Sequence, residues 1–107
     1  IIDFVERINT AEGILISGYN QRIKNYIKSN FGRAVVLDHH VNRPGFVHDD
    51  FKAALNNFFA KNPTVLKDPA MWGGNQESNE SAILNEYKIT RRMTKSAERF
   101  NNLRGKL

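Results

Sequence analysis

Residues 13–37, GILISGYNQRIKNYIKSNFGRAVVL, carry the strongest indications of a fold in this chain. Two short apolar runs, residues 14–16 and residues 34–37, are rich in branched side chains, which favours buried strands. Between them, apolar residues recur at helical spacing over residues 19–31, and Gly32 ends the pattern. The order strand, helix, strand predicts a short βαβ-like unit with two parallel strands. An antiparallel arrangement of the two strands is the alternative.

Three further segments show helical patterns outside this unit. Residues 2–11 place apolar side chains at helical spacing, and residues 49–60 begin with two aspartates, either of which can cap a helix. A loop anchored by Trp72 then precedes a basic amphipathic helix that is expected within residues 78–107. The predicted fold is α/β or α+β and helix-rich, with a short βαβ-like unit followed by two helices, of which the last is long and basic.

Two of the expected helices have an apolar face that should lie in the core. In the segment 49–60, this face is expected to bury Phe51, Leu55 and Phe58. In the last helix, the apolar stripe is expected to run through Ile89, Met93, Ala97, Phe100 and Leu103. Both stripes follow the helical period, so each predicts a helix that packs on the domain. Ile83 and Tyr87 lie off the stripe of the last helix, which indicates that this helix bends or meets two different surfaces.

The composition limits the class of protein. The chain has 107 residues, 16 Lys and Arg against 11 Asp and Glu, a net charge of +5, and no Cys. This length predicts one small domain, and the lack of Cys excludes disulfide scaffolds, Cys-ligated zinc fingers and thiol catalysis. The longest apolar runs are far shorter than a transmembrane helix requires. Because the chain starts at Ile1 without a Met or a visible signal peptide, we expect an intracellular fragment of a larger or processed protein.

The positive charge is concentrated in two segments. Residues 13–37 contain four Lys and Arg and no acid, and residues 88–107 contain seven Lys and Arg and one Glu. Between them, residues 38–50 contain three Asp and one Arg. Two basic segments predict a polyanionic partner, and DNA or RNA is the preferred candidate. An acidic protein partner and an anionic membrane surface are the alternatives.

The last basic segment predicts a row of cations along one helix. On a continuous helix, five of its cations fall close to one line: Lys88, Arg92, Lys95, Arg99 and Lys106. Arg91 and Arg104 widen this row. Four cations of the first basic segment are expected to assist it: Arg22, Lys24, Lys28 and Arg33. Such a row can contact successive phosphates without reading the bases. The predicted function is therefore nucleic-acid backbone contact through the C-terminal helix, and a protein-interaction or structural domain of a viral or secretion-system protein is an alternative.

All three histidines lie within residues 38–50, together with three aspartates. Imidazole and carboxylate are ligand types for Mn and Zn, and carboxylate also suits Mg, so one divalent metal ion is predicted at Asp38, His39 and His48. His40 is the candidate catalytic acid or base beside it. These residues predict an alternative function as a metal-dependent, toxin-like nuclease or phosphoesterase. A structural alternative is that the aspartates cap helices and turns.

Residues 35–40, VVLDHH, resemble the Asp-His-His motif of the DHH phosphoesterase superfamily, in which an apolar strand ends in that tripeptide. The resemblance implies a manganese-type site for phosphodiester hydrolysis, with Asp38 and His39 as ligands. Such enzymes also use upstream aspartate-rich motifs, whereas Asp3 is the only Asp before Asp38 in this chain. The same tripeptide is similar to part of the core of His-Me finger (HNH-type) nucleases, although no His follows residue 48.

Overall fold

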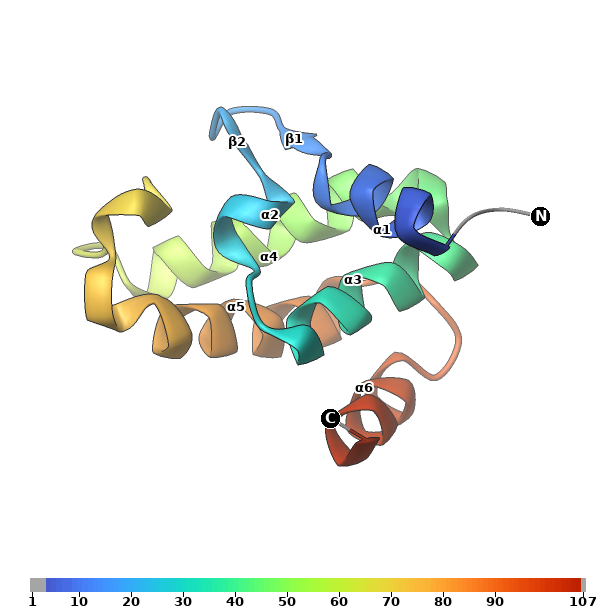
Figure 1. Cartoon of the computed structure of the whole chain (residues 1–107). Coiled ribbons are helices and arrows are strands. Elements are labelled where there is room, and N and C mark those ends of the chain that lie inside the picture. The colour runs from blue at the N-terminus through green and yellow to red at the C-terminus, as the bar shows by residue number, and fades with distance from the viewer. Residues whose placement is uncertain (1–3, 107) are drawn as a thin grey trace.

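The computed structural model describes the backbone of residues 4–106 and the side chains of residues 6–105. Within that part of the chain, six α-helices accompany one ribbon of two short strands (Figure 1). In chain order the elements are α1 (Phe4–Glu12), β1 (Leu15–Ile16), β2 (Gln21–Arg22), α2 (Ile23–Tyr26), α3 (Asn30–Asn42), α4 (Val47–Lys61), α5 (Gln76–Thr90) and α6 (Ser96–Lys106). The expected helix-rich α+β class is confirmed. A helix with the length and hydrophobicity of a membrane span does not occur among the described residues.

Two of the expected helices lie close to their predicted bounds. α1 confirms the helix expected over residues 2–11 from residue 4 onward, and Ile2 lies outside the described residues. α4 confirms the helix expected over residues 49–60 and extends it by a few residues at its N-terminal end. The residues predicted to form its inward face are all buried: Phe51, Leu55 and Phe58.

The predicted βαβ-like unit is wrong. β1 and β2 pair antiparallel, in the register that places Leu15 opposite Arg22. The chain reverses between them through Gly18 and Asn20, which both have positive φ angles that these residue types tolerate. Because of this tight turn, the helix predicted over residues 19–31 does not form at its N-terminal end. One helical turn, α2, forms within that range.

The apolar run at residues 34–37 lies inside α3 and does not form a second strand. Ser29 caps this helix, because its hydroxyl accepts a hydrogen bond from the backbone N–H of Gly32 at 3.0 Å. Four apolar residues are too few to distinguish a strand from a buried helix by their period. In α3, Val35 and His39 share the buried face one turn apart. The Asp-His-His tripeptide is therefore helical and does not follow a strand.

The core lies between α4 and α5, which run side by side in opposite directions (Figure 1). At its centre is a series of aromatic rings from α2, α4, α5 and the loop between α4 and α5: Tyr26, Phe51, Phe58, Trp72 and Tyr87. Neighbouring rings meet at tilted or edge-to-face angles, which aromatic pairs prefer. The Trp72 indole donates a hydrogen bond to the Leu66 carbonyl at 2.7 Å, so this side chain anchors the loop as expected.

Glu80 of α5 fixes the start of α3. Its buried carboxylate accepts hydrogen bonds from the backbone N–H groups of Lys28 and Ser29, and from the Ser29 hydroxyl. Gly32 is packed so closely here that a Cβ would lie 2.6 Å from Ile27 Cγ2. The glycine therefore permits a close approach within the first turn of α3, and the prediction that it ends a helix is wrong.

The long C-terminal helix predicted from residue 78 is broken. Residues 91–95 link α5 to α6, and Lys95 within this link has a φ of 56°, in the left-handed region. α6 turns away from the axis of α5 and packs against α3 and α5 (Figure 1). The predicted apolar stripe is wrong, because Ile89 is 77% exposed whereas Phe100 is buried.

Candidate functional site

The three predicted metal ligands point to different places. Asp38 and His39 are consecutive on α3, so their side chains lie about 100° apart around the helix axis. Asp38 contacts α6, whereas His39 is buried in the core. His48 lies in the first turn of α4, where its Nε2 accepts a hydrogen bond from the Ser17 backbone N–H at 3.1 Å. No group of three His, Asp or Glu side chains in the described residues is arranged to hold a metal ion, so the predicted metal site loses its geometric basis.

His39 belongs to a buried polar network. Its Nδ1 lies 2.5 Å from the Tyr87 hydroxyl, and its Nε2 lies 3.4 Å from Asp50 Oδ2 without a hydrogen bond. Burial lowers the pKa of His39 to about 4, so the ring is neutral at pH 7. Because the three residues come from α3, α4 and α5, the network joins these helices.

His40, the predicted catalytic acid or base, is half-buried at the next position of α3. Its Nδ1 has no hydrogen-bond partner among the described residues. Burial lowers the pKa of His40, and the charge of Arg7 lowers it further. A catalytic imidazole is normally oriented by a hydrogen bond to its second ring nitrogen. The structure shows no such partner at Nδ1, and the catalytic role of His40 stays a prediction.

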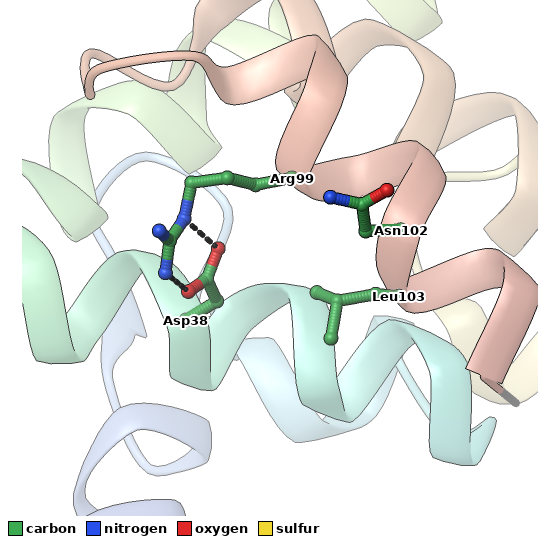
Figure 2. Close-up of a pocket in the computed structure, with 4 residues that line it drawn as sticks. All are labelled: Asp38, Arg99, Asn102 and Leu103. Atoms are coloured by element: carbon green, nitrogen blue, oxygen red, sulfur yellow. Dashed lines mark hydrogen bonds and ion pairs between the residues drawn. The ribbon is translucent and has the colours of Figure 1, made fainter.

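Asp38 forms an ion pair between α3 and α6 (Figure 2). Arg99 donates to it twice, from Nε to Oδ2 at 3.1 Å and from Nη2 to Oδ1 at 2.5 Å. Figure 2 shows the two planar groups facing each other beside a small pocket that Asn102 and Leu103 also line. The same carboxylate is shared with Arg91, whose Nη1 lies 3.5 Å from Oδ2. One carboxylate therefore faces two guanidinium groups, and this cluster keeps one positive charge in excess.

Arg91 is a buried structural residue. It is 2% exposed, and it donates hydrogen bonds to the Val35 carbonyl at 3.1 Å and to the Ser96 hydroxyl and carbonyl at 2.7 and 2.8 Å. These bonds join α3 to the start of α6. The prediction that Arg91 widens a surface row of cations is therefore wrong, because the N–H donors of its guanidinium group form hydrogen bonds inside the protein.

The break at residues 91–95 also separates the other members of the predicted row. Lys88 stays on α5, where its ammonium lies 5.3 Å from the centroid of the Phe100 ring. Arg92 lies in the link, and its Nε donates to Asp50 Oδ1 at 2.8 Å. A single line of five cations requires a continuous helix, so this part of the prediction is wrong.

The remaining residues that the sequence predicts as phosphate contacts lie away from the junction of α3 and α6 or outside the described residues. Arg22, in β2, donates a hydrogen bond to the Gly13 carbonyl. Lys28 is exposed between α2 and α3. The side chain of Lys106 lies outside the described residues. The pocket described next is not lined by Arg22, Lys24, Lys28, Arg33 or Arg104.

Three exposed cations converge on one polar pocket, where the end of α3 meets the 91–95 link and the first turn of α6. This junction pocket has a volume of about 350 Å³, and its lining residues are Asn42, Arg43, Met93, Thr94, Lys95 and Arg99. No Asp or Glu among the described residues lines it. The three cations come from segments that are separated by about fifty residues of sequence but are brought together by the packing of α6 on α3.

Two of these cations have no counter-charge in the part of the chain that the structure describes. Neither Arg43 nor Lys95 forms an ion pair with a described residue. Arg99 uses Nε and Nη2 to bind Asp38, which leaves its Nη1 without a partner among the described residues. The pocket therefore presents free donors and an excess of positive charge, which together favour an anion.

Sequence reasoning missed Arg43. It is the only Lys or Arg within residues 38–50, so the acidic average of that segment concealed it. The available signal is its place directly before Pro44-Gly45, because such a turn ends a helix and exposes the residue at its end. The partner segment could not be deduced, since nothing in the sequence pairs the end of α3 with the start of α6.

Comparisons of the chain with protein-family models, with curated proteins and with solved structures find no match. The function is therefore inferred from the geometry and charge of the side chains.

Proposed function

We propose that this protein binds nucleic acid through its phosphate backbone, with the junction pocket at the centre of the contact surface. The observation that carries this proposal is the convergence of Arg43, Lys95 and Arg99 on one polar pocket, whose lining contains no acid among the described residues. Lys and Arg are the side chains that neutralise phosphates and release their counterions. Three of them in one concave site form a compact contact, in place of the linear row that the sequence predicts.

The charge pattern around the pocket favours a polyanion over a surface that only contacts water. A solvated surface usually mixes both signs, so that neighbouring charges neutralise one another. Here Arg43 and Lys95 have no carboxylate partner among the side chains of residues 6–105, and Asp38 is shared between Arg91 and Arg99. Arg92 adds an exposed guanidinium in the adjoining link, although it is paired with Asp50.

The proposed contact reads phosphates and not bases. Guanidinium and ammonium groups bind phosphate oxygens in the same way whatever the neighbouring base. Binding should therefore be independent of sequence, and its affinity should fall steeply as the salt concentration rises. DNA and RNA are both expected to bind, because both carry the backbone charge.

The proposal is tested by neutralising the two unpaired cations. We expect the double variant Arg43→Gln/Lys95→Gln to bind a single-stranded oligonucleotide roughly 10- to 100-fold more weakly at about 0.1 M salt, since each lost phosphate contact removes about one power of salt dependence. The slope of log affinity against log salt should become shallower by about 1.4 for a single strand. Fluorescence anisotropy with labelled DNA and RNA measures both quantities.

The matched control is Lys24→Gln/Lys67→Gln, which changes the net charge by the same amount. Both lysines are exposed, and they lie on α2 and in the loop between α4 and α5, outside the pocket. This control should reduce the affinity no more than about threefold, through the general loss of positive charge. Equal losses in the two double variants would show that only net charge matters and would contradict a binding site at the junction.

A further inference from the structure

We infer that the junction pocket holds a terminal phosphate of the bound strand, which is a phosphomonoester, in preference to an internal phosphodiester. This inference rests on the proposed function and makes it more specific. It follows from the number of donors that converge on the pocket, from their charge, and from the shape of the site.

The donors match the three free oxygens of a phosphomonoester. Arg43 offers its guanidinium from the end of α3, Lys95 offers its ammonium from the link, and Arg99 offers Nη1 from α6. The Asn42 amide is not available, because its Nδ2 donates to the Asp38 backbone carbonyl at 2.7 Å and to Asp38 Oδ1 at 3.2 Å. An internal phosphodiester has only two non-bridging oxygens, and it carries two ester substituents that a concave pocket must accommodate.

The charge of the pocket also suits a dianion. The three lining cations and the single contacting carboxylate of Asp38 leave a net charge of +2. A phosphomonoester carries about −1.5 to −2 at pH 7, whereas each phosphodiester of a nucleic-acid backbone carries −1. Buried Arg91 lies behind Asp38 and adds to the positive potential.

The helix ends at the pocket act in opposite directions. α6 begins directly after Lys95, and its first backbone N–H groups form the positive end of the helix dipole. The Ser96 hydroxyl does not cap them, because it donates to the Lys88 carbonyl at 2.8 Å and accepts from Arg91. The negative end of α3 also lies here, and Arg43 follows it directly. Because the two helix ends have opposite effects on an anion, the preference of the site for an anion depends on the cationic side chains.

Lys95 occupies a backbone conformation that its residue type does not favour. Its φ of 56° is typical of Gly and Asn, and a side chain with a Cβ is strained there by about 1–2 kcal/mol. Strained positions of this kind cluster at functional sites. The same conformation supplies a clean variant, since Lys95→Gly removes the ammonium and relieves the backbone.

The test compares oligonucleotides of one sequence that carry a 5′-phosphate, a 3′-phosphate or hydroxyls at both ends. The parent protein should bind at least one phosphorylated form about tenfold more tightly than the hydroxyl form, the effect of one added charge-assisted hydrogen bond. The two phosphorylated arms show which end of the strand enters the pocket. In Lys95→Gly the ratio should fall to about one, whereas Lys67→Gly, at an exposed loop position outside the pocket, should keep the ratio of the parent.

The outcomes separate the two proposals. The terminal-phosphate inference is overturned if the protein binds all three oligonucleotides with equal affinity. The proposed function remains intact in that case if the affinity still falls with rising salt and is still reduced in Arg43→Gln/Lys95→Gln. A preference that persists in Lys95→Gly would also overturn the inference. If none of the oligonucleotides binds, both proposals fail. Thermal melting confirms that Lys95→Gly is folded, and Lys95→Asn, which also tolerates the left-handed region, provides a second variant.

Discussion

The middle and the C-terminal end of α5 are held in the molecule by different interactions. Its middle packs against α4 through buried Ile83, Leu84 and Tyr87, within a core of aromatic rings. Its C-terminal end is held by charged groups, where Arg91 and Arg92 contact carboxylates and carbonyls of α3 and α4. Apolar packing sets the stability of the core and depends little on salt or on pH. The charged junction depends on both, and it positions the cations that are proposed to bind phosphate.

The largest expected effect is in the aromatic core. Phe58→Ala should lower the free energy of unfolding by about 3–5 kcal/mol, because it removes a buried ring and leaves a cavity. A small domain has roughly 5–15 kcal/mol in total, so this variant should be close to unfolding. Urea denaturation measures the change. The control is Phe46→Ala, at a ring that is 39% exposed, and a similar loss there would contradict the assigned core.

A smaller effect is expected from the buried cation of the junction. Arg91→Met should lower the free energy of unfolding by about 2–3 kcal/mol, because the Val35 carbonyl and the Ser96 oxygens lose their donors in a buried site. Asp38 keeps Arg99 as a partner, which limits the loss. Lys67→Met, at an exposed position, should stay within about 0.5 kcal/mol of the parent. If Arg91→Met is as stable as this control, then the link at residues 91–95 is not held by Arg91.

The buried network at His39 predicts that stability falls in mild acid. Burial lowers the pKa of His39 to about 4 in the folded state, from 6.5 in the unfolded chain. The unfolded state therefore binds the proton more readily, and the free energy of unfolding falls as the pH drops from 6.5 toward 4. Between pH 7.5 and pH 5, His39 should account for about 2 kcal/mol.

Variants at the two buried histidines measure this effect. His39→Gln should reduce the difference between denaturation curves recorded at pH 7.5 and at pH 5. Burial also lowers the pKa of His40, so His40 acts in the same direction, and His40→Gln measures its share. A pH dependence that is identical in the parent and in His39→Gln would show that His39 is not a buried neutral group.

The smallest expected effect on stability is that of a variant at Asp38. This variant separates the stability of the junction from its binding of nucleic acid, because the two are expected to change in opposite directions. Asp38→Asn should cost about 1 kcal/mol of stability, since it weakens the pair with Arg99. It should also tighten oligonucleotide binding about three- to tenfold, because Arg99 is released from its carboxylate and the pocket loses a negative charge. Melting curves and anisotropy on the same preparation test both changes. Weaker binding in Asp38→Asn would mean that the carboxylate positions Arg99 for the ligand.

The sequence is a good guide where apolar residues follow a clear period over a long segment. α4 is found where its pattern predicts it, because its apolar face is continuous. The aspartates do not cap it as expected, since the helix begins at Val47 and Asp49 and Asp50 lie within its first turn. The run at residues 34–37 is misleading, since four branched residues are typical of a strand and equally fit one turn of a buried helix. The turn that makes β1 and β2 antiparallel is set by Gly18 and Asn20, whose positive φ angles a periodicity pattern does not detect.

The candidate site is harder to predict, because it depends on a helix break without the usual signals. Residues 90–96 contain no Gly or Pro, and the break places Arg91 in a buried position that composition alone would assign to the surface. Lys95 and Arg99 are predicted as phosphate contacts from the basic segment, and they line the pocket, although their role there stays a prediction. Arg43 joins them only through tertiary packing. The predicted metal ligands diverge because Asp38 and His39 are consecutive on α3 and His48 lies on α4.

The most direct test of the central proposal is to locate the bound strand on the protein. Backbone amide NMR spectra, recorded while a single-stranded oligonucleotide is added, report which residues lie near the ligand. The structure predicts that the largest chemical-shift changes fall in residues 42–45 and 93–99, which surround the junction pocket. Arg43→Gln/Lys95→Gln should remove most of these changes. Two results would contradict a nucleic-acid site at the junction. One is a set of chemical-shift changes confined to residues 22–28, and the other is an absence of changes around the junction pocket at an oligonucleotide concentration that saturates binding.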